Sequence, residues 1–412
     1  MVTLGVSRLL HDPGVAPGWV SAGRRVGLLT SRGALTGPAS APSPTPRLLL
    51  DAGIPLIRLF SPEHGLYARE GDGLPVPNGV DRETGLPVVS LYGKNLTPPP
   101  ETLADLDGVL VDLQDAGARF YTYSRTMQHL MVSCDESRIP LAVLDRPNPL
   151  GGSPEAVEGP LPDSDLPTSF LCPWSFPVRH SLTLGEMALL LQREMGLHLN
   201  LAVVTMEGWR RSALWPDTGL PFHPPSPGLP QIQSVFLYPG LALLEATNIS
   251  EGRGTPLSFR WFGADWMDGE KVAARLCELE IPGLQAQPRE LEDRGPRGRA
   301  READSGHPTG GGQVRSGVRL DVTDPSRFRP VTAGLRILAL LRTLYPREFS
   351  WAPYPTAVNP GGLNHLLHLL RCRRLVEALE GDPGRLLDGE ALAMGMEAPG
   401  WWDRARPHLL YD

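Results

Sequence analysis

Residues 108–123 read Gly-Val-Leu-Val-Asp-Leu-Gln-Asp-Ala-Gly-Ala-Arg-Phe-Tyr-Thr-Tyr. The run from Gly108 to Leu113 is apolar at almost every position, so both of its faces would be buried, as in a parallel sheet covered by helices on both sides. A polar loop follows at once, and residues 122–137 have the composition of a helix. The stretch therefore predicts one strand, loop and helix of an α/β layer.

Further units of the same kind lie on either side of this stretch. Apolar runs that predict strands cover residues 25–30, 56–60, 141–144 and 199–204. Helices are predicted over residues 46–52 and after Thr183, which precedes Glu186 by three residues, as in a capping box. The N-terminal half therefore predicts a Rossmann-like domain with a parallel sheet. Ligands bind such sheets beyond the carboxyl ends of their strands.

The length of 412 residues favours two domains, because a chain of this size exceeds one ordinary core. Prolines and glycines gather in residues 221–230, so we place the junction there, with domains at 1–225 and 226–412. The second domain is expected to be smaller and of mixed α+β type, with a strand over 318–322 and a helix over 331–345. Residues 285–314 are poor in apolar side chains and predict a flexible surface loop. The active-site cleft is expected between the domains.

The charge argues against two classes of partner. A net charge of −7 provides no broad basic field for nucleic acid or for an anionic membrane. The N-terminal residues show no signal peptide or membrane anchor, which predicts a cytoplasmic protein, although an exported form stays possible. The oligomeric state does not follow from the sequence.

The most informative loop follows the second predicted strand. Phe60-Ser61-Pro62-Glu63-His64-Gly65 places a carboxylate beside an imidazole at a strand end, where an acid or base could act. When the loop is taken alone, a helix cap or an ion pair with an arginine such as Arg69 explains Glu63 better than catalysis does.

Other polar loops strengthen the functional interpretation, because several of them follow strands that should end at one edge of the sheet. Asp115 and Arg119 could still satisfy each other, and His180 could be held by the backbone alone. The candidate ligand-contacting residues in these loops are Asp115, Arg119, Tyr121, Tyr123, Asp145, Arg146, Asn148, Arg179, His180, Asn248, Glu251 and Arg253.

Taken in order, four of these segments resemble the exo-β-N-acetylmuramidase (NamZ) family. They are Ser61–Gly65, Asp115–Tyr123, Asp145–Pro149 and Ser250–Thr255. The resemblance extends over nearly the whole chain, but residues 66–73 and 285–316 depart from the common pattern. It implies a glycoside hydrolase that removes terminal non-reducing β-N-acetylmuramic acid from peptidoglycan fragments, with Glu63 as the proposed catalytic residue.

Glycoside cleavage usually needs an acid and a second group that acts at the sugar carbon. Glu63 is the candidate acid and His64 would orient it. Asp115 or Glu251 could activate water, or the substrate's own acetamido group could act instead. Arg119, Arg146, Arg179 or Arg253 could bind the lactyl carboxylate, and Tyr121 and Tyr123 could pack on the sugar.

No cofactor or metal is expected, although His64, Asp115 and His180 could be combined into a metal site on paper. The alternatives are a carbohydrate-binding protein without catalysis and a metal-assisted hydrolase of another ester or amide. A nucleotide-binding protein is disfavoured because no glycine-rich dinucleotide fingerprint follows the early strands.

Overall fold

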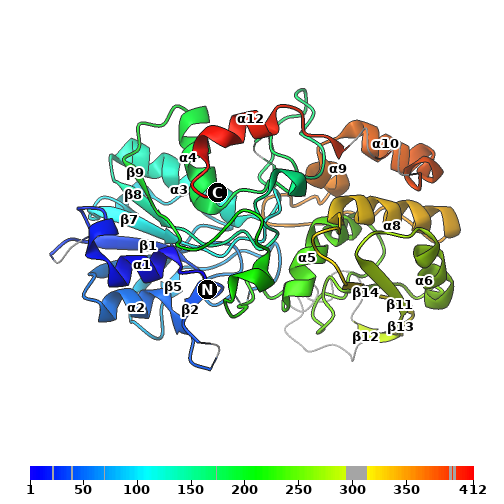
Figure 1. Ribbon diagram of the computed structural model, residues 1–412, viewed down its shortest axis with the longest axis horizontal. Helices are drawn as coiled ribbons and strands as arrows, with labels where there is room; N and C mark the ends of the chain where they lie inside the picture. The colour runs from blue at the N-terminus through cyan, green and yellow to red at the C-terminus, as the bar shows by residue number, and fades with distance from the viewer. Residues whose placement is uncertain are drawn as a thin grey trace.

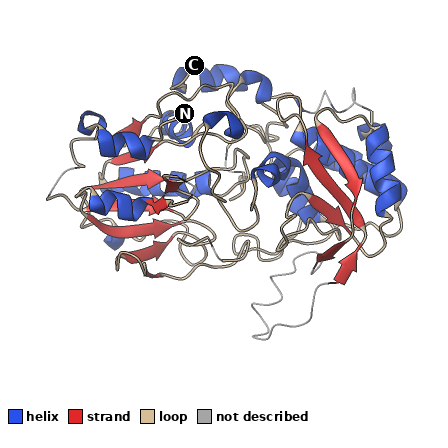
Figure 2. Cartoon of the chain, turned by 60° about the horizontal axis from the view of Figure 1, so that its bottom comes forward, coloured by secondary structure: helices blue, strands red, loops and turns tan. Residues whose placement is uncertain are grey.

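The computed structural model describes residues 1–20, 23–38, 40–68, 70–172, 174–293, 313–388, 392 and 396–412. The chain forms two parts that lie side by side, each with its own sheet (Figures 1 and 2). The predicted α/β fold class is confirmed, because a large, mostly parallel sheet occupies the N-terminal part and a second domain follows it.

The first sheet has seven strands in the order β5-β6-β4-β1-β7-β8-β9. Every neighbouring pair is parallel except the edge pair β5 and β6. The strands are β1 (Val26–Thr30), β4 (Leu56–Ser61), β5 (Gly79–Val80), β6 (Pro87–Ser90), β7 (Gly108–Asp112), β8 (Leu141–Leu144) and β9 (Leu201–Val204). A short hairpin of β2 (Leu35–Thr36) and β3 (Ser43–Pro44) lies outside this sheet.

The strands are apolar at successive positions because both faces of the sheet are covered. On β7, Val109 and Val111 join the core cluster that contains α3 and α4 residues, whereas Leu110 joins a second cluster with α1 and α2. The helices are α1 (Gly5–His11), α2 (Thr45–Asp51), α3 (Tyr123–Ser137) and α4 (Leu184–Glu194). This arrangement leaves the loops at the carboxyl ends of the strands to form a binding site.

The predicted capping box begins α4. The Thr183 hydroxyl accepts a hydrogen bond from the Glu186 backbone N–H at 3.2 Å, and the Glu186 carboxylate accepts one from the Thr183 N–H at 3.0 Å. The same hydroxyl donates to Asp145 at 2.7 Å. One side chain thus fixes both the helix start and the loop after β8.

Replacing Thr183 by alanine should lower the free energy of unfolding by about 1–2 kcal/mol, the typical cost of losing a helix cap. Urea denaturation measures this change, and Thr183→Ser is the matched control because it keeps the hydroxyl. An alanine variant as stable as the serine variant would contradict the assignment.

The second domain has an antiparallel three-stranded sheet in the order β10-β14-β11. Helix α5 packs on α8 at a close crossing, where Gly240 and Gly334 face each other. A Cβ added at Gly240 would lie 2.0 Å from the Pro330 carbonyl oxygen, so only glycine fits there. The elements are α5 (Ile232–Leu241), β10 (Trp261–Gly263), α6 (Gly269–Glu278), β11 (Leu284–Pro288), β14 (Gly317–Val322) and α8 (Pro330–Leu344).

The expectation of a flexible loop over residues 285–314 is wrong at both ends of that range. Strands β11, β12 (Leu291–Asp293) and β13 (Gln313–Arg315) lie there, and β11 pairs with β14. Pairing to a buried neighbour through backbone hydrogen bonds gives order that side-chain composition does not reveal. Residues 294–312 lie outside the described part of the chain.

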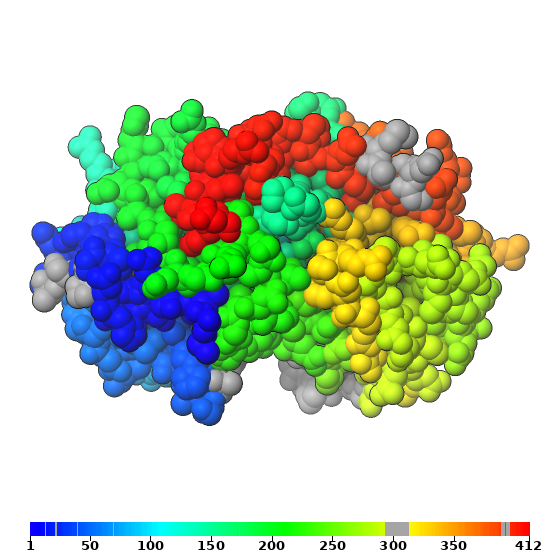
Figure 3. All heavy atoms as spheres, in the orientation of Figure 1, coloured from blue at the N-terminus to red at the C-terminus, as the bar shows by residue number. Residues whose placement is uncertain are grey.

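The other α-helices in the described part of the chain are α9 (His365–Leu370), α10 (Arg373–Gly381) and α12 (Trp401–Ala405). After α10 the chain returns to the first domain, where α12 lies over α4 (Figures 1 and 3). The Trp401 indole N–H donates to the His180 carbonyl at 3.1 Å, and the Tyr411 hydroxyl donates to Asp145 at 2.6 Å. The domain boundary at residue 225 stays a prediction. That boundary assigns the C-terminal tail to the second domain, but the tail packs against the first.

One core runs through both domains. The cluster that includes Val109 and Leu130 on the first sheet and α3 also includes Phe262, Leu338 and Leu370 of the second domain. The two parts are therefore packed together as one body around the cleft. In the described residues, no helix has the length and apolar character needed to span a membrane.

Candidate active site

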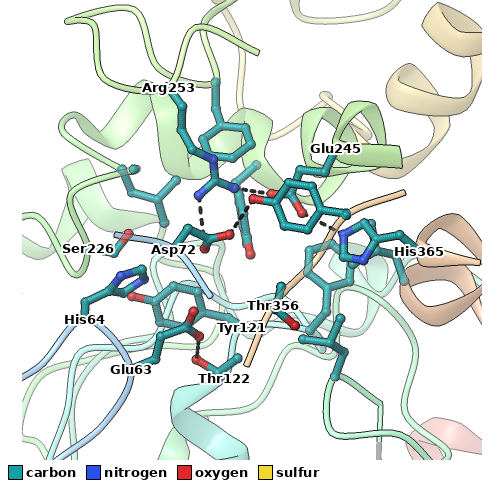
Figure 4. A pocket seen from close by; sticks show the side chains of 18 of the residues that line it. Glu63, His64, Asp72, Tyr121, Thr122, Ser226, Glu245, Arg253, Thr356 and His365 are labelled. Carbon is teal, nitrogen blue, oxygen red and sulfur yellow. Dashed lines mark hydrogen bonds and ion pairs between the residues drawn. The ribbon is translucent and has the colours of Figure 1, made fainter. Parts of the chain in front are cut away.

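A pocket lies between the two domains, at the carboxyl edge of the first sheet (Figure 4). It holds about 550 Å³ of space outside the protein atoms, including its open mouth. The first domain contributes Glu63, His64, Asp72, Tyr92, Tyr121 and Thr122. The second contributes Ser226, Tyr238, Glu245, Arg253, Tyr354 and His365.

A tight turn after β4 carries Glu63 into the pocket. His64 has a φ of 67° and Gly65 a φ of 71°, so two successive residues adopt the left-handed conformation. This conformation is unfavourable for histidine, and local contacts stabilise it. The His64 Nδ1 donates to the Glu70 carbonyl at 3.0 Å, and the Glu70 N–H donates to the His64 carbonyl at 3.2 Å. These bonds fix the orientation of the imidazole beside Glu63.

Glu63 is held by two hydrogen bonds and is 4% exposed. Its Oε1 accepts from the Gly73 N–H at 2.8 Å and its Oε2 from the Thr122 hydroxyl at 2.6 Å. Burial raises the pKa of Glu63, and the negative charge of Asp72 raises it further, whereas His64 and the two hydrogen bonds lower it. The net effect is a raised pKa, as expected of a general acid. Arg69, considered above as an ion-pair partner, lies outside the described residues.

Arg253 joins the loop of Asp72 to the second domain. Its guanidinium lies 3.0 Å from Asp72 and 2.9 Å from Glu251, and it also pairs with Glu245. Burial opposes the charge of Arg253, but these carboxylates outweigh burial and raise its pKa. Burial likewise opposes the ionisation of Asp72, yet Arg253, His64 and a hydrogen bond from the Tyr354 hydroxyl at 2.5 Å lower the pKa of Asp72 below its usual value. Asp72 is therefore a stable anion next to Glu63.

His365 completes this network from α9. Its Nε2 lies 2.9 Å from Glu245, and its ring stacks on Tyr354 with centroids 4.5 Å apart. Glu245 thus lies between Arg253 and His365, as Figure 4 shows. The far wall of the pocket is a chain of charged and aromatic groups that fixes Arg253 and, through it, Asp72.

Four of the residues predicted from the sequence line this pocket together: Glu63, His64, Tyr121 and Arg253. Glu251 lies just behind the lining, paired with Arg253. Asp115 accepts a hydrogen bond from the Gly117 N–H at 2.7 Å and lies 3.7 Å from the ring of His180. The structure therefore brings together the Glu63 and Arg253 loops and places Asp115 outside the lining.

The remaining predicted residues are engaged within the protein, away from the lining of the pocket. Their partners are mostly backbone groups of neighbouring loops, which favours a structural role. Four of them donate to backbone carbonyls: Tyr123 to Pro225, Asn148 to Leu182, Arg179 to Leu150 and Asn248 to Glu348. Asp145 accepts hydrogen bonds from Thr183, Gly185 and Tyr411, and the Nδ1 of His180 accepts one from the Leu182 N–H. Arg146 forms an ion pair with Asp112.

Arg119 also binds backbone carbonyls. It donates to the carbonyl oxygens of Pro160, Leu369 and Leu370 at 2.8–2.9 Å and to that of Phe176. These acceptors belong to both halves of the chain, so Arg119 ties the end of α9 to the first domain. The pairing of Arg119 with Asp115, which the sequence left open as an alternative, does not occur among these contacts.

Replacing Arg119 by methionine should lower the free energy of unfolding by at least about 2 kcal/mol, because several buried carbonyls lose a charged donor. The KM of the active protein should change little, since Arg119 does not line the pocket. Denaturant unfolding and steady-state kinetics separate the two effects. A raised KM with unchanged stability would instead place Arg119 in the binding site.

The set of His64, Asp115 and His180 is not brought together. In the described ranges, the group of three whose ligand-type atoms lie within 4.8 Å of one another consists of Glu63, His64 and Asp72. The guanidinium of Arg253 already neutralises Asp72, and Glu63 accepts two hydrogen bonds. These contacts favour a site that holds a proton over one that holds a cation.

Asp72, Glu245, Tyr354 and His365 were not among the predicted site residues. Asp72 lies between Gly71 and Gly73, and this Gly-Asp-Gly sequence soon after the Glu63 loop was an available signal. Glu245 begins the segment that leads to Asn248 and Arg253. Tyr354 and His365 follow no strand of the first sheet, and only the fold brings them to the pocket.

Comparisons with known proteins agree with this geometry. Residues 26–233 match the N-terminal family model of the exo-β-N-acetylmuramidase NamZ, and residues 236–394 match its C-terminal model. The peptidoglycan β-N-acetylmuramidase NamZ of Bacillus subtilis (strain 168) is 38% identical over 332 residues, which is 80% of this chain and 75% of that protein.

Two solved structures, both of DUF1343 family proteins from Bacteroides fragilis NCTC 9343, cover 100% of this chain and 99% of their own. The first has a TM-score of 0.81 at 28% identity. The second has a TM-score of 0.66 at 23% identity and supports the fold alone. With both family models matched across most of its length, the chain belongs to the exo-β-N-acetylmuramidase NamZ family.

Proposed function

We propose that this protein is a glycoside hydrolase that removes terminal β-N-acetylmuramic acid from the non-reducing end of peptidoglycan fragments. The family and the Bacillus subtilis relative support the activity and the substrate class. The observation that carries the assignment of the site is the position of Glu63, a buried carboxyl with a raised pKa that lines the pocket between the domains.

Glu63 acts as the general acid in this proposal. A protonated Glu63 gives its proton to the glycosidic oxygen as the bond to the leaving sugar breaks. Protonation also removes one negative charge from a pocket that contains Asp72 and Glu245, so a sugar with a lactyl carboxylate meets less repulsion. The same proton therefore serves binding and bond cleavage.

The contacts of the candidate residues limit which group can act at the sugar carbon as the second catalytic group. Asp115 lies outside the lining of the pocket, and Glu251 is paired with Arg253. The acetamido oxygen of the substrate is the remaining candidate among those that the sequence suggested. We therefore favour attack by the substrate's own acetamido group at the sugar carbon, with Glu63 as acid and then as base toward water.

Only one of the four predicted arginines is placed to bind the lactyl carboxylate of the substrate. Arg253 is the member of the four predicted arginines that lines the pocket, and three carboxylates already surround it. A lactyl carboxylate near Arg253 would have to share this cation. Tyr121 lines the same pocket and offers an aromatic face to the sugar.

The test is the release of free sugar from a chromogenic β-N-acetylmuramic acid glycoside, compared with the β-N-acetylglucosamine analogue, with and without a chelator. Release from the muramic substrate alone, unaffected by chelator, is expected. Measurable sugar binding without release would support a carbohydrate-binding protein instead. Release that the chelator abolishes would support a metal-assisted hydrolase.

A further inference from the structure

The carboxyl groups of Glu63 and Asp72 lie close together in the pocket, and they differ in the charge of the groups that contact them. The closest-lying atoms of Glu63, His64 and Asp72 fall within 4.8 Å of one another. Asp72 has a cation at 3.0 Å and a hydroxyl donor at 2.5 Å, whereas the Gly73 N–H and the Thr122 hydroxyl, which donate to Glu63, are neutral. Two like charges at this separation are unfavourable, so a single negative charge settles on the better-stabilised carboxylate.

The ion pair between Asp72 and Arg253, which stabilises the negative charge of Asp72, joins the two domains. Asp72 belongs to the loop after β4, and Arg253 belongs to the segment between α5 and β10. Glu245, Glu251 and the ring of Phe259, 4.8 Å from the guanidinium, hold Arg253 in place from the second domain. The second domain therefore stabilises the charge of Asp72 through Arg253 and through the Tyr354 hydroxyl.

Other titratable groups also face Glu63. Those of the first domain are His64, Asp72, Tyr92 and Tyr123. Those of the second domain that line the same pocket are Tyr238, Glu245, Arg253, Tyr354 and His365. Burial raises the pKa of each of these tyrosines, so they stay neutral near pH 7. Among the acids that act on Glu63, Asp72 has the largest influence.

We propose that Asp72 is a positioning residue of this active site, which Arg253 holds as an anion and which keeps the catalytic proton on Glu63 until the substrate binds. The inference rests on the proposed function for its meaning in catalysis. The coupling between the two carboxyls exists in the protein without substrate, and it can be measured there.

The pH dependence of kcat/KM tests the role in catalysis. A general acid must be protonated, so activity falls as pH rises through the pKa of Glu63 in the free enzyme. Asp72→Asn removes a neighbouring negative charge at nearly constant shape, so Glu63 loses its proton more easily. The basic limb of the profile should therefore move to lower pH. An unmoved limb would overturn the proposal.

Tyr354→Phe is the matched variant. It removes the hydrogen bond to Asp72 but leaves the charge, which Arg253 still stabilises. Its basic limb should stay where the wild-type limb lies, whatever happens to kcat. A shift equal to that of Asp72→Asn would mean that packing moves the limb, and the proposal would fail. Asp72→Ser, also uncharged, replaces Asp72→Asn if that variant does not fold.

A titration without substrate separates this inference from the proposed activity. In protein labelled with ¹³C at the glutamate carboxyl, the Glu63 signal is assigned by its loss in Glu63→Gln. Its titration midpoint should be lower in Asp72→Asn than in the wild type. If the wild type releases no sugar, the proposed function fails while this comparison still decides the role of Asp72. Equal midpoints would sink the inference even in an active enzyme.

Discussion

Glu63→Gln should reduce kcat by about 10²–10⁴-fold, the usual contribution of a general acid or base. Glutamine has nearly the same shape, its oxygen can accept the hydrogen bond from the Gly73 N–H, and its NH2 group can donate to the Thr122 hydroxyl oxygen. It has no proton to give to the leaving oxygen. We therefore expect a folded protein that binds the muramic substrate but turns it over very slowly. Single-turnover and steady-state assays on the chromogenic glycoside measure the loss.

The control for this substitution is Glu101→Gln, which makes the same change at an exposed position on the surface. It should leave kcat and KM unchanged. Full activity of Glu63→Gln would remove Glu63 from the mechanism. Weak binding together with lost turnover would mean that the carboxyl positions the sugar more than it protonates it.

Arg253→Met should lower the free energy of unfolding by about 3–5 kcal/mol, because removing one partner of a buried ion pair leaves uncompensated charge. The arginine serves three carboxylates at once, Asp72, Glu245 and Glu251, and its side chain is 17% exposed. Methionine fills much of the volume but supplies no charge. Activity should be lost as well, since the loop of Asp72 loses its anchor to the second domain.

The stability deficit of Arg253→Met should depend on pH. In the wild type the pKa of Asp72 is lowered, so its contribution is present above its unfolded pKa and is lost as pH falls through its folded pKa. In the variant, buried carboxylates without a cation bind protons more readily in the folded state, so stability decreases as pH rises. The two stability curves should therefore converge at acidic pH and diverge toward neutral pH.

Denaturant unfolding at several pH values checks this prediction. Arg275→Met is the matched control, because Arg275 forms a surface pair with Glu278 and its side chain is 52% exposed. Surface pairs contribute about 0–1 kcal/mol, so that variant should unfold almost as the wild type does. Adding Glu245→Gln to Arg253→Met should recover part of the loss. A deficit that is constant with pH would show that packing, and not charge, is what Arg253 provides.

The first sheet was predictable from the sequence because its strands are buried on both faces. The predicted strand at 141–144 has the same limits as β8, and those at 25–30 and 56–60 differ from β1 and β4 by one residue at one end. Such runs are continuous and apolar and end at polar loops, so they are hard to mistake. Strand β6, which lies next to the edge strand β5, and helix α5 were not predicted. Pro87 begins the former, and Pro239 lies inside the latter.

In the first domain, the site was predictable where a strand of the first sheet leads into it. Glu63 follows β4 directly, and its loop stood out because proline and glycine flank an acid and an imidazole. Asp145, Arg146 and Asn148 also follow a strand, but the structure directs these side chains to the backbone of neighbouring loops. A polar side chain at a strand end can either meet a ligand or hold the loops that do, and sequence patterns alone do not separate these uses.

The far wall of the pocket could not be predicted because its members come together only through the packing of the domains. His365 and Glu245 are separated by 120 positions and meet at 2.9 Å. Asp72 and Tyr354 are separated by 282 positions. Contacts of this kind leave no periodic signal in the chain.

The continuous core has a consequence for how this protein can evolve. Side chains of both domains fill the same interior, and the last residues of the chain return to seal the first domain. An exchange of the C-terminal domain between relatives would have to match that interior, the carbonyls that Arg119 binds and the tail in a single event. The two domains are thus expected to be inherited as one unit, and new specificity is expected to arise in the loops around the pocket.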